Sequence, residues 1–104
     1  MTVSKEEGND LLDFYEELLT DKQKDVLSLY FKEDLSLSEI AEDLSISRSA
    51  VSDLLNRTLH QLKNYEAKLS LISNYQKRQK IYRKLEELEN PEISLLVEEL
   101  KNLE

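Results

Sequence analysis

The side chains best suited to specific chemistry in this sequence are polar and basic, and they gather between residues 47 and 63. If Ser47 caps a helix, the unpaired amides of the first turn can bind a phosphate, assisted by the helix dipole. Arg48 has the donors to contact guanine or phosphate, and Asn56 has the groups to contact adenine or a sugar. The pattern therefore predicts a nucleic-acid-binding set made of Ser47, Arg48, Ser49, Ser52, Asn56, Arg57 and Lys63.

A second basic patch follows later in the chain. Tyr65, Tyr75 and Tyr82 fall near it, so one interpretation is that these rings stack on RNA bases. The other interpretation is that the tyrosines are core or interface aromatics. The patch consists of Lys77, Arg78, Lys80, Arg83 and Lys84.

The charges are distributed unevenly along the 104 residues. The net charge is −8 for the whole chain, but it is −9 for residues 1–44, +7 for 45–84 and −6 for 85–104. A basic middle between acidic ends is expected when one surface faces a polyanion. Alternatively, the basic segment pairs with the acidic ends of its own chain or of a second copy.

Residue types needed for other chemistries are scarce. There is no cysteine and only one histidine, His60, so neither a thiolate nor a histidine-rich metal site is expected. Carboxylate pairs such as Glu16-Glu17 have no catalytic partner, so we expect a non-enzymatic protein without a cofactor. No stretch approaches the ~20 apolar residues of a membrane span, so we expect no membrane insertion and a cytoplasmic location.

The elements that must position these residues are predicted to be helices. One glycine and one proline leave little turn chemistry for hairpins, and good helix formers dominate. We therefore expect one all-α domain over 1–104, with a core at about 20–62 and a helical extension at about 63–104.

Helix starts are marked by local signals. A first helix is expected from Asn9 or Asp10, and capping boxes at Thr20 and Ser36 begin the next two. Ser47 then caps a long fourth helix. The first helix should bury Leu11, Leu12, Phe14, Tyr15, Leu18 and Leu19.

The stretch from Leu37 to Leu54 has the spacing of a helix-turn-helix. A small residue, Ala41, stands where the two helices touch, and Ser45 occupies the turn position that usually holds glycine. Apolar residues at fixed intervals lock the helices together: Ile40, Leu44, Ile46, Val51 and Leu54. The segment resembles sigma-70 region 4, without a wing, which implies a recognition helix that reads DNA in the major groove.

A longer resemblance runs from Leu12 to about Tyr82. It rests on segments 14–15, 18–23, 29–30, 36–41, 47–53 and 65–69, which look like the YlxM family of small bacterial proteins. The resemblance implies a regulator of the signal recognition particle pathway, with its GTPase or its RNA as partner. Ser49 and Asn56 depart from the family pattern and reduce the donors on the recognition helix. The alternative function is a dimeric DNA-binding transcriptional regulator, and a third is a protein-interaction scaffold.

Apolar residues also recur at heptad-like spacing along the extended fourth helix. We expect this seam, together with a further apolar stripe near the C-terminus, to form a homodimer. The rival interpretation is that the C-terminal helices fold back on the long helix. The predicted dimer interface comprises Leu55, Leu62, Tyr65, Leu69 and Ile72.

Overall fold

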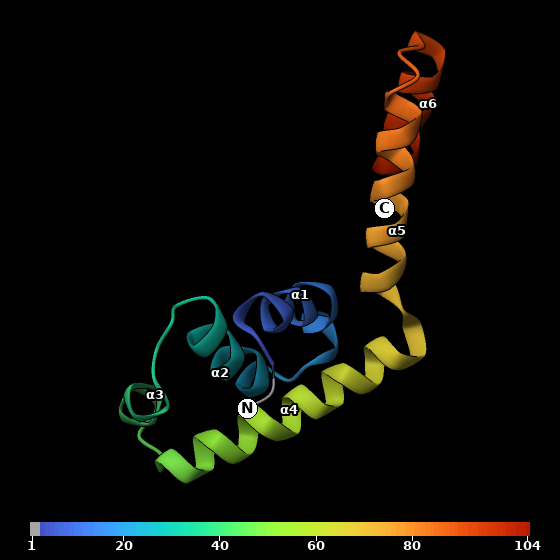
Figure 1. Cartoon of the computed structure of the whole chain (residues 1–104). Helices are drawn as coiled ribbons and strands as arrows, with labels where there is room; N and C mark the ends of the chain where they lie inside the picture. Colours follow the sequence, from blue (N-terminus) through green and yellow to red (C-terminus); the bar gives the residue numbers. More distant parts are fainter. Residues whose placement is uncertain (1–2) are drawn as a thin grey trace. The chain divides into compact units, whose positions relative to one another are not determined.

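The computed structural model describes residues 3–104, and within that range it contains helices and no strand, which confirms the all-α class. The elements in order are α1 (Lys5–Tyr15), the 3-10 helix η1 (Glu16–Leu18), α2 (Asp21–Phe31), α3 (Leu37–Leu44), α4 (Arg48–Leu69), α5 (Leu71–Glu86) and α6 (Pro91–Asn102), as labelled in Figure 1. They form two units: one extends to Ile72, and the other runs from Ser73 to Glu104. The first unit thus includes α1 and extends beyond the end of α4.

Hydrogen bonds between near neighbours explain where most helices begin. The capping boxes of α2 and α3 are confirmed: Thr20 and Ser36 each accept an amide three residues on, and Gln23 and Glu39 accept their amides in return. The predicted start of α1 at Asn9 or Asp10 is wrong. The helix begins at Lys5 because Ser4 Oγ accepts the Glu7 amide at 3.1 Å.

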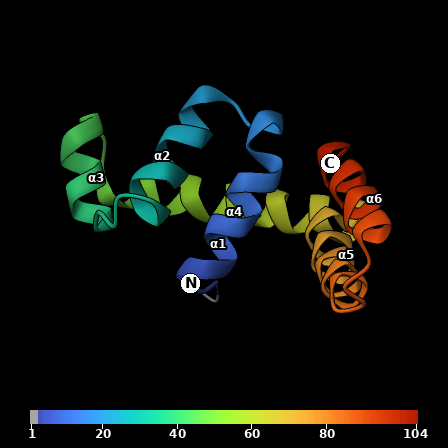
Figure 2. The ribbon, with the colours of Figure 1, turned by 90° about the horizontal axis from the view of Figure 1, so that it is seen from above.

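The core of the first unit forms where α1, α2 and α3 pack against α4 (Figure 2). Leu18, expected in this core, is 52% exposed. The reason is that the chain leaves α1 after Tyr15 and enters η1, whose tighter turn rotates Leu18 off the buried face. The buried residues are Leu11, Leu12, Tyr15, Leu19, Val26, Leu27, Phe31, Ile40, Ala41, Val51, Leu55, Leu59 and Leu62.

The predicted dimer seam on α4 is largely occupied within the chain. Leu55 and Leu62 are completely buried in the core, so neither side chain can contact a second copy, and this part of the prediction is corrected. Tyr65 and Ile72 are half-buried against the same core, while Leu69 is about half exposed. The seam faces inward because α1 and α2 cover that side of α4.

The fourth helix is also shorter than expected. It ends at Leu69 because Ser70 adopts a left-handed conformation, with φ 54°, and donates its amide to the Glu66 carbonyl. Ile72 consequently lies on α5 rather than on α4. No glycine or proline marks this break, so the residue types alone gave no signal of it.

A side-chain network satisfies the backbone at the start of α5. The Ile72 amide donates to Glu66 Oε1 at 3.0 Å, and the Leu71 amide donates to the Tyr15 hydroxyl at 3.2 Å. Tyr15 in turn donates to Glu66 Oε1 at 2.5 Å. Burial, together with this bond to Glu66, raises the pKa of Tyr15. The network joins α1 to the end of α4, and so explains why the first unit extends to Ile72.

Gly8 supplies a test of how closely α1 and α2 pack. A Cβ at this position would overlap the ring of Phe31, which is itself buried. We expect Gly8→Ala to lower the free energy of unfolding by about 1–3 kcal/mol, because the overlap outweighs alanine's better helix propensity. Urea denaturation measures the change. Phe31→Leu in the Gly8→Ala background should recover part of the loss, and a Gly8→Ala protein as stable as the parent would contradict the packing.

The second unit is a helical hairpin in which α6 runs antiparallel to α5. Tyr82 of α5 and Val97 of α6 are buried, and the Tyr82 hydroxyl donates to Glu104 Oε2 at 2.8 Å. Lys101 donates to Glu86 at 3.1 Å, nearer the connecting turn. The hydrogen bond from Tyr82 lowers the pKa of Glu104, with Arg78 as a further cause. Within the second unit, the C-terminal segment therefore folds back on α5.

No helix among residues 3–104 is both long enough and apolar enough to cross a bilayer.

Candidate nucleic-acid interface

The turn between α3 and α4 sets the two helices of the helix-turn-helix. Ser45 is left-handed, with φ 56° and ψ 42°, the conformation that favours glycine at this position. Its amide donates to the carbonyls of Ala41 and Glu42, and the Ile46 amide donates to the Ala41 carbonyl at 3.0 Å. These bonds satisfy the end of α3, so the turn forms with serine in place of glycine.

The first turn of α4 has the cap expected from the sequence. Ser47 Oγ accepts the Ala50 amide at 3.1 Å and lies 3.3 Å from Ser49 Oγ. Arg48 and Ser49 are exposed beside it. The cap places the unpaired amides at the start of α4 next to exposed polar and cationic side chains, as an anion-binding helix end requires.

Most of the predicted contact residues share one face of α4. Ser49, Ser52, Asn56 and Lys63 recur at helical spacing, and of these only Ser52 is half-buried rather than exposed. Arg57 lies off this face and forms an ion pair with Asp53, with 2.9 Å between Nη2 and Oδ2. Both groups are well exposed, so the pair adds little stability, but it neutralises a carboxylate that would repel phosphate.

Exposed acidic residues occur on α3, and the sequence did not predict that they bear on the candidate interface. Glu39, Glu42 and Asp43 line a shallow groove together with Leu35. The hydrogen bond from the Ser36 amide lowers the pKa of Glu39. From α3 to residue 57 the chain carries four carboxylates and two arginines, a charge balance that disfavours non-specific binding to a polyanion.

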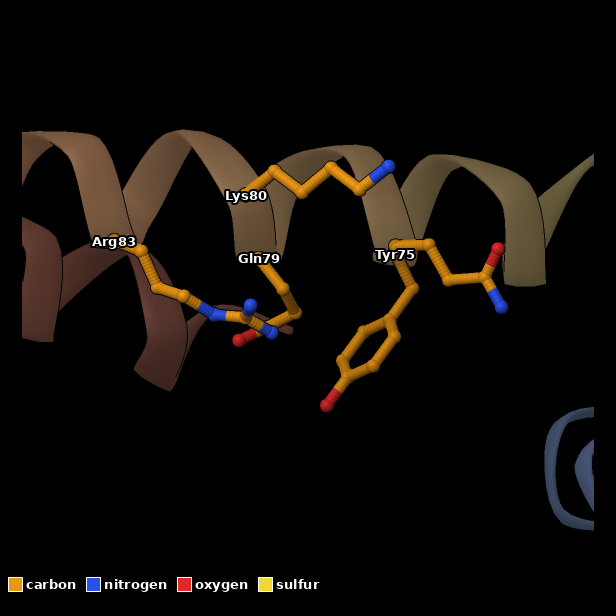
Figure 3. Close-up of a pocket in the computed structure, with 5 residues that line it drawn as sticks. Tyr75, Gln79, Lys80 and Arg83 are labelled. Carbon is orange, nitrogen blue, oxygen red and sulfur yellow. The ribbon is translucent and has the colours of Figure 1, made fainter.

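The second basic patch is divided by the hairpin. Arg78 is half-buried, and its Nε donates to Glu104 Oε1 at 3.0 Å, so it is engaged within the unit. Lys80 and Arg83 line a shallow groove on α5 with Tyr75 (Figure 3). Lys77 and Lys84 are exposed and do not line this groove. Gln76 and Gln79, which were not predicted from the sequence, complete the groove. Gln79 lies four residues after Tyr75, and Gln76 lies four residues before Lys80. This helical spacing was the signal that could have placed them on the same face.

The groove on α5 combines an aromatic ring, two cations and two amides. Figure 3 shows the side chains of Tyr75, Gln79 and Arg83 extending from successive turns of one helix. Rings of this kind stack on unpaired bases, and the cations can contact the phosphates between them. By contrast, Tyr82 is buried and Tyr65 is half-buried in the core, as expected for structural aromatics.

Comparison with known proteins agrees with the helix-turn-helix geometry. The family described as "Putative helix-turn-helix protein, YlxM / p13 like" matches residues 3–102. The chain belongs to this family. The UPF0122 protein YlxM of Bacillus subtilis is 46% identical over 101 residues, covering 92% of each chain. UPF0122 relatives from Bacillus velezensis and Bacillus cereus are 45% and 44% identical, covering 92% of this chain and at least 92% of their own. The resemblance to the YlxM family noted in the sequence is confirmed.

Proposed function

We propose that this member of the YlxM family is a cytoplasmic, non-enzymatic regulatory protein that binds nucleic acid through α4 and acts as a homodimer. The observation that carries the proposal is the exposed polar face of α4, where Ser49, Asn56 and Lys63 follow the Ser47 cap. The adjoining side of α4 is buried against α1, α2 and α3, so the scaffold fixes the position of this face.

The expected ligand of this face is duplex DNA read at a specific sequence. The acidic residues of α3 and the low positive charge of the segment weaken non-specific attraction, so specific contacts must supply more of the affinity. Arg48 and Asn56 have the side-chain groups for such contacts. Two recognition helices in a homodimer would read two half-sites.

Selection from a random duplex library tests this function. We expect a sequence to be enriched, and Arg48→Ala or Asn56→Ala to reduce discrimination at one base position by about 1–3 kcal/mol. Lys22→Ala, which removes an exposed charge on α2, is the matched control and should not change the preference. Failure to enrich any sequence would contradict DNA readout by α4.

The groove on α5 favours a second candidate function within the signal recognition particle pathway. Tyr75, Lys80 and Arg83 are suited to single-stranded RNA, and the family resemblance implies the particle's RNA or its GTPase as partner. Binding of the particle RNA at two salt concentrations tests this, with Lys80→Gln and Arg83→Gln as variants. Each lost phosphate contact should reduce the slope of the log binding constant against log salt concentration by about one. An unchanged slope would contradict RNA binding by this groove and would leave the GTPase as the partner to test.

A further inference from the structure

The C-terminal hairpin leaves many large apolar side chains exposed. A hairpin of two helices has no second layer to cover such side chains, whereas helical bundles bury them against further helices. Exposed apolar area of this kind marks an interaction surface. Besides Leu95, which is 68% exposed, the side chains more than two-fifths exposed are Ile81, Leu88, Leu96, Leu100 and Leu103.

These side chains lie on one face of the hairpin. Tyr82 and Val97 are the buried residues where α5 and α6 meet, and Ile81 and Leu96 each precede them by one position. Antiparallel helices are related by a local twofold axis normal to their common plane, so equivalent positions point to the same side. The same offset relates Leu85 to Leu100 and Leu88 to Leu103. We call these six residues, from Ile81 to Leu103, the apolar hairpin face.

Charges along the outer edges of this face are opposite on the two helices. Lys77 and Lys84 follow the α5 edge, and the equivalent positions on α6 are Glu92 and Glu99. All four residues are exposed. The apolar hairpin face thus has a basic edge on α5 and an acidic edge on α6. If a second copy is turned by 180° about the helix direction, its face meets the first and its basic edge lies over the first copy's acidic edge.

We propose that the apolar hairpin face binds a second copy of this chain, with α5 of each copy lying over α6 of the other. A twofold rotation about the helix direction keeps each residue at its own level along the hairpin, and the Glu86–Lys101 ion pair shows that Lys84 and Glu99 lie at nearly the same level. The arrangement therefore sets Lys84 of each copy near Glu99 of the other, and the four helices bury both apolar faces. The other symmetric arrangement, α5 over α5, would place like charges along both edges. The inference extends the homodimer of the proposed function by naming its surface, and it replaces the seam on α4.

The groove on α5 stays accessible in such a dimer. Arg83 follows Tyr82 by one position, whereas Ile81 precedes it, so Arg83 and Ile81 lie on opposite sides of the line where α5 meets α6. Arg83 therefore faces away from the second copy, and Lys80, two positions before Tyr82, lies on the side of α5 away from α6. Nucleic acid and the second chain do not compete for the same side of the hairpin.

Two adjacent leucines give the first test. We expect the full-length protein to sediment as a dimer at tens of micromolar, Leu96→Lys to sediment as a monomer, and Leu95→Lys to remain dimeric. Leu95 is at least as exposed as Leu96 but lies outside the apolar hairpin face, on the side of α6 away from α5. A monomeric parent protein, a dimeric Leu96→Lys variant or dissociation by both substitutions would overturn the proposal.

Charge reversal at exposed residues gives a second test, which leaves all apolar side chains of the hairpin unchanged. Lys84→Glu, and separately Glu99→Lys, should each raise the dimer dissociation constant at least tenfold, because each change places like charges together twice across the symmetric interface. An equimolar mixture of the two variants should form heterodimers, because both edges are then complementary again. Unchanged dissociation constants would rule out α5 over α6. These measurements need no nucleic acid, so their failure leaves DNA binding by α4 standing, and loss of DNA binding leaves the dimer standing.

Discussion

Leu62→Ala is expected to lower the free energy of unfolding by about 2–5 kcal/mol, the cost of removing a buried leucine side chain and leaving a cavity. Leu62 is fully buried in the core of the first unit. Because its neighbours belong to the same chain, the loss should not depend on protein concentration. Urea denaturation at two protein concentrations measures both features.

Leu69→Ala is the matched control for this substitution. Leu69 occupies the same predicted seam two turns later, but it is about half exposed. We expect a loss below about 1 kcal/mol, because much less apolar surface leaves water there on folding. If the two substitutions had equal effects, or if the effect of Leu62→Ala vanished at low concentration, the seam would face a second copy instead of α1 and α2.

Ala41→Glu is expected to destabilise the helix-turn-helix by several kcal/mol. Ala41 is 8% exposed where α3 packs on α4, and its carbonyl accepts the Ile46 amide that closes the turn. A glutamate there must either bury a charge without a partner or push the helices apart. Thermal unfolding followed by circular dichroism should show a clearly lowered midpoint.

Ala67→Glu provides the control, since Ala67 is exposed on α4. The same change of residue type at this site should alter stability by about 0.5 kcal/mol or less. Because Ala41 positions the recognition helix, Ala41→Glu should also abolish DNA selection by α4. An unchanged midpoint for Ala41→Glu would mean that α3 and α4 do not meet at this residue.

Features carried by neighbouring residues could be predicted from the sequence. The caps at Thr20, Ser36 and Ser47 are interactions across three residues, so residue type and spacing suffice to identify them. The Asp53–Arg57 pair across one helical turn is of the same kind. The left-handed turn at Ser45 followed from the helix-turn-helix spacing, although serine stands where glycine is usual.

Features that depend on distant residues were decided by the tertiary structure. The apolar positions of α4 fit a dimer seam and a monomer core equally well, and only the packing of α1 and α2 assigned Leu55 and Leu62 to the core. Likewise, Ser70 ends α4 where Tyr15 and Glu66 can bind the first amides of α5.

The candidate sites likewise combine features that are evident in the sequence with features that only the fold decides. The basic residues of α5 are evident in the sequence, but the fold of the hairpin engages Arg78 with Glu104 and leaves Lys80 and Arg83 in a groove. Helical periodicity reports that a face is apolar, because it depends on spacing alone. It does not report what covers that face, because the covering residues come from other segments that chain folding or association brings into contact.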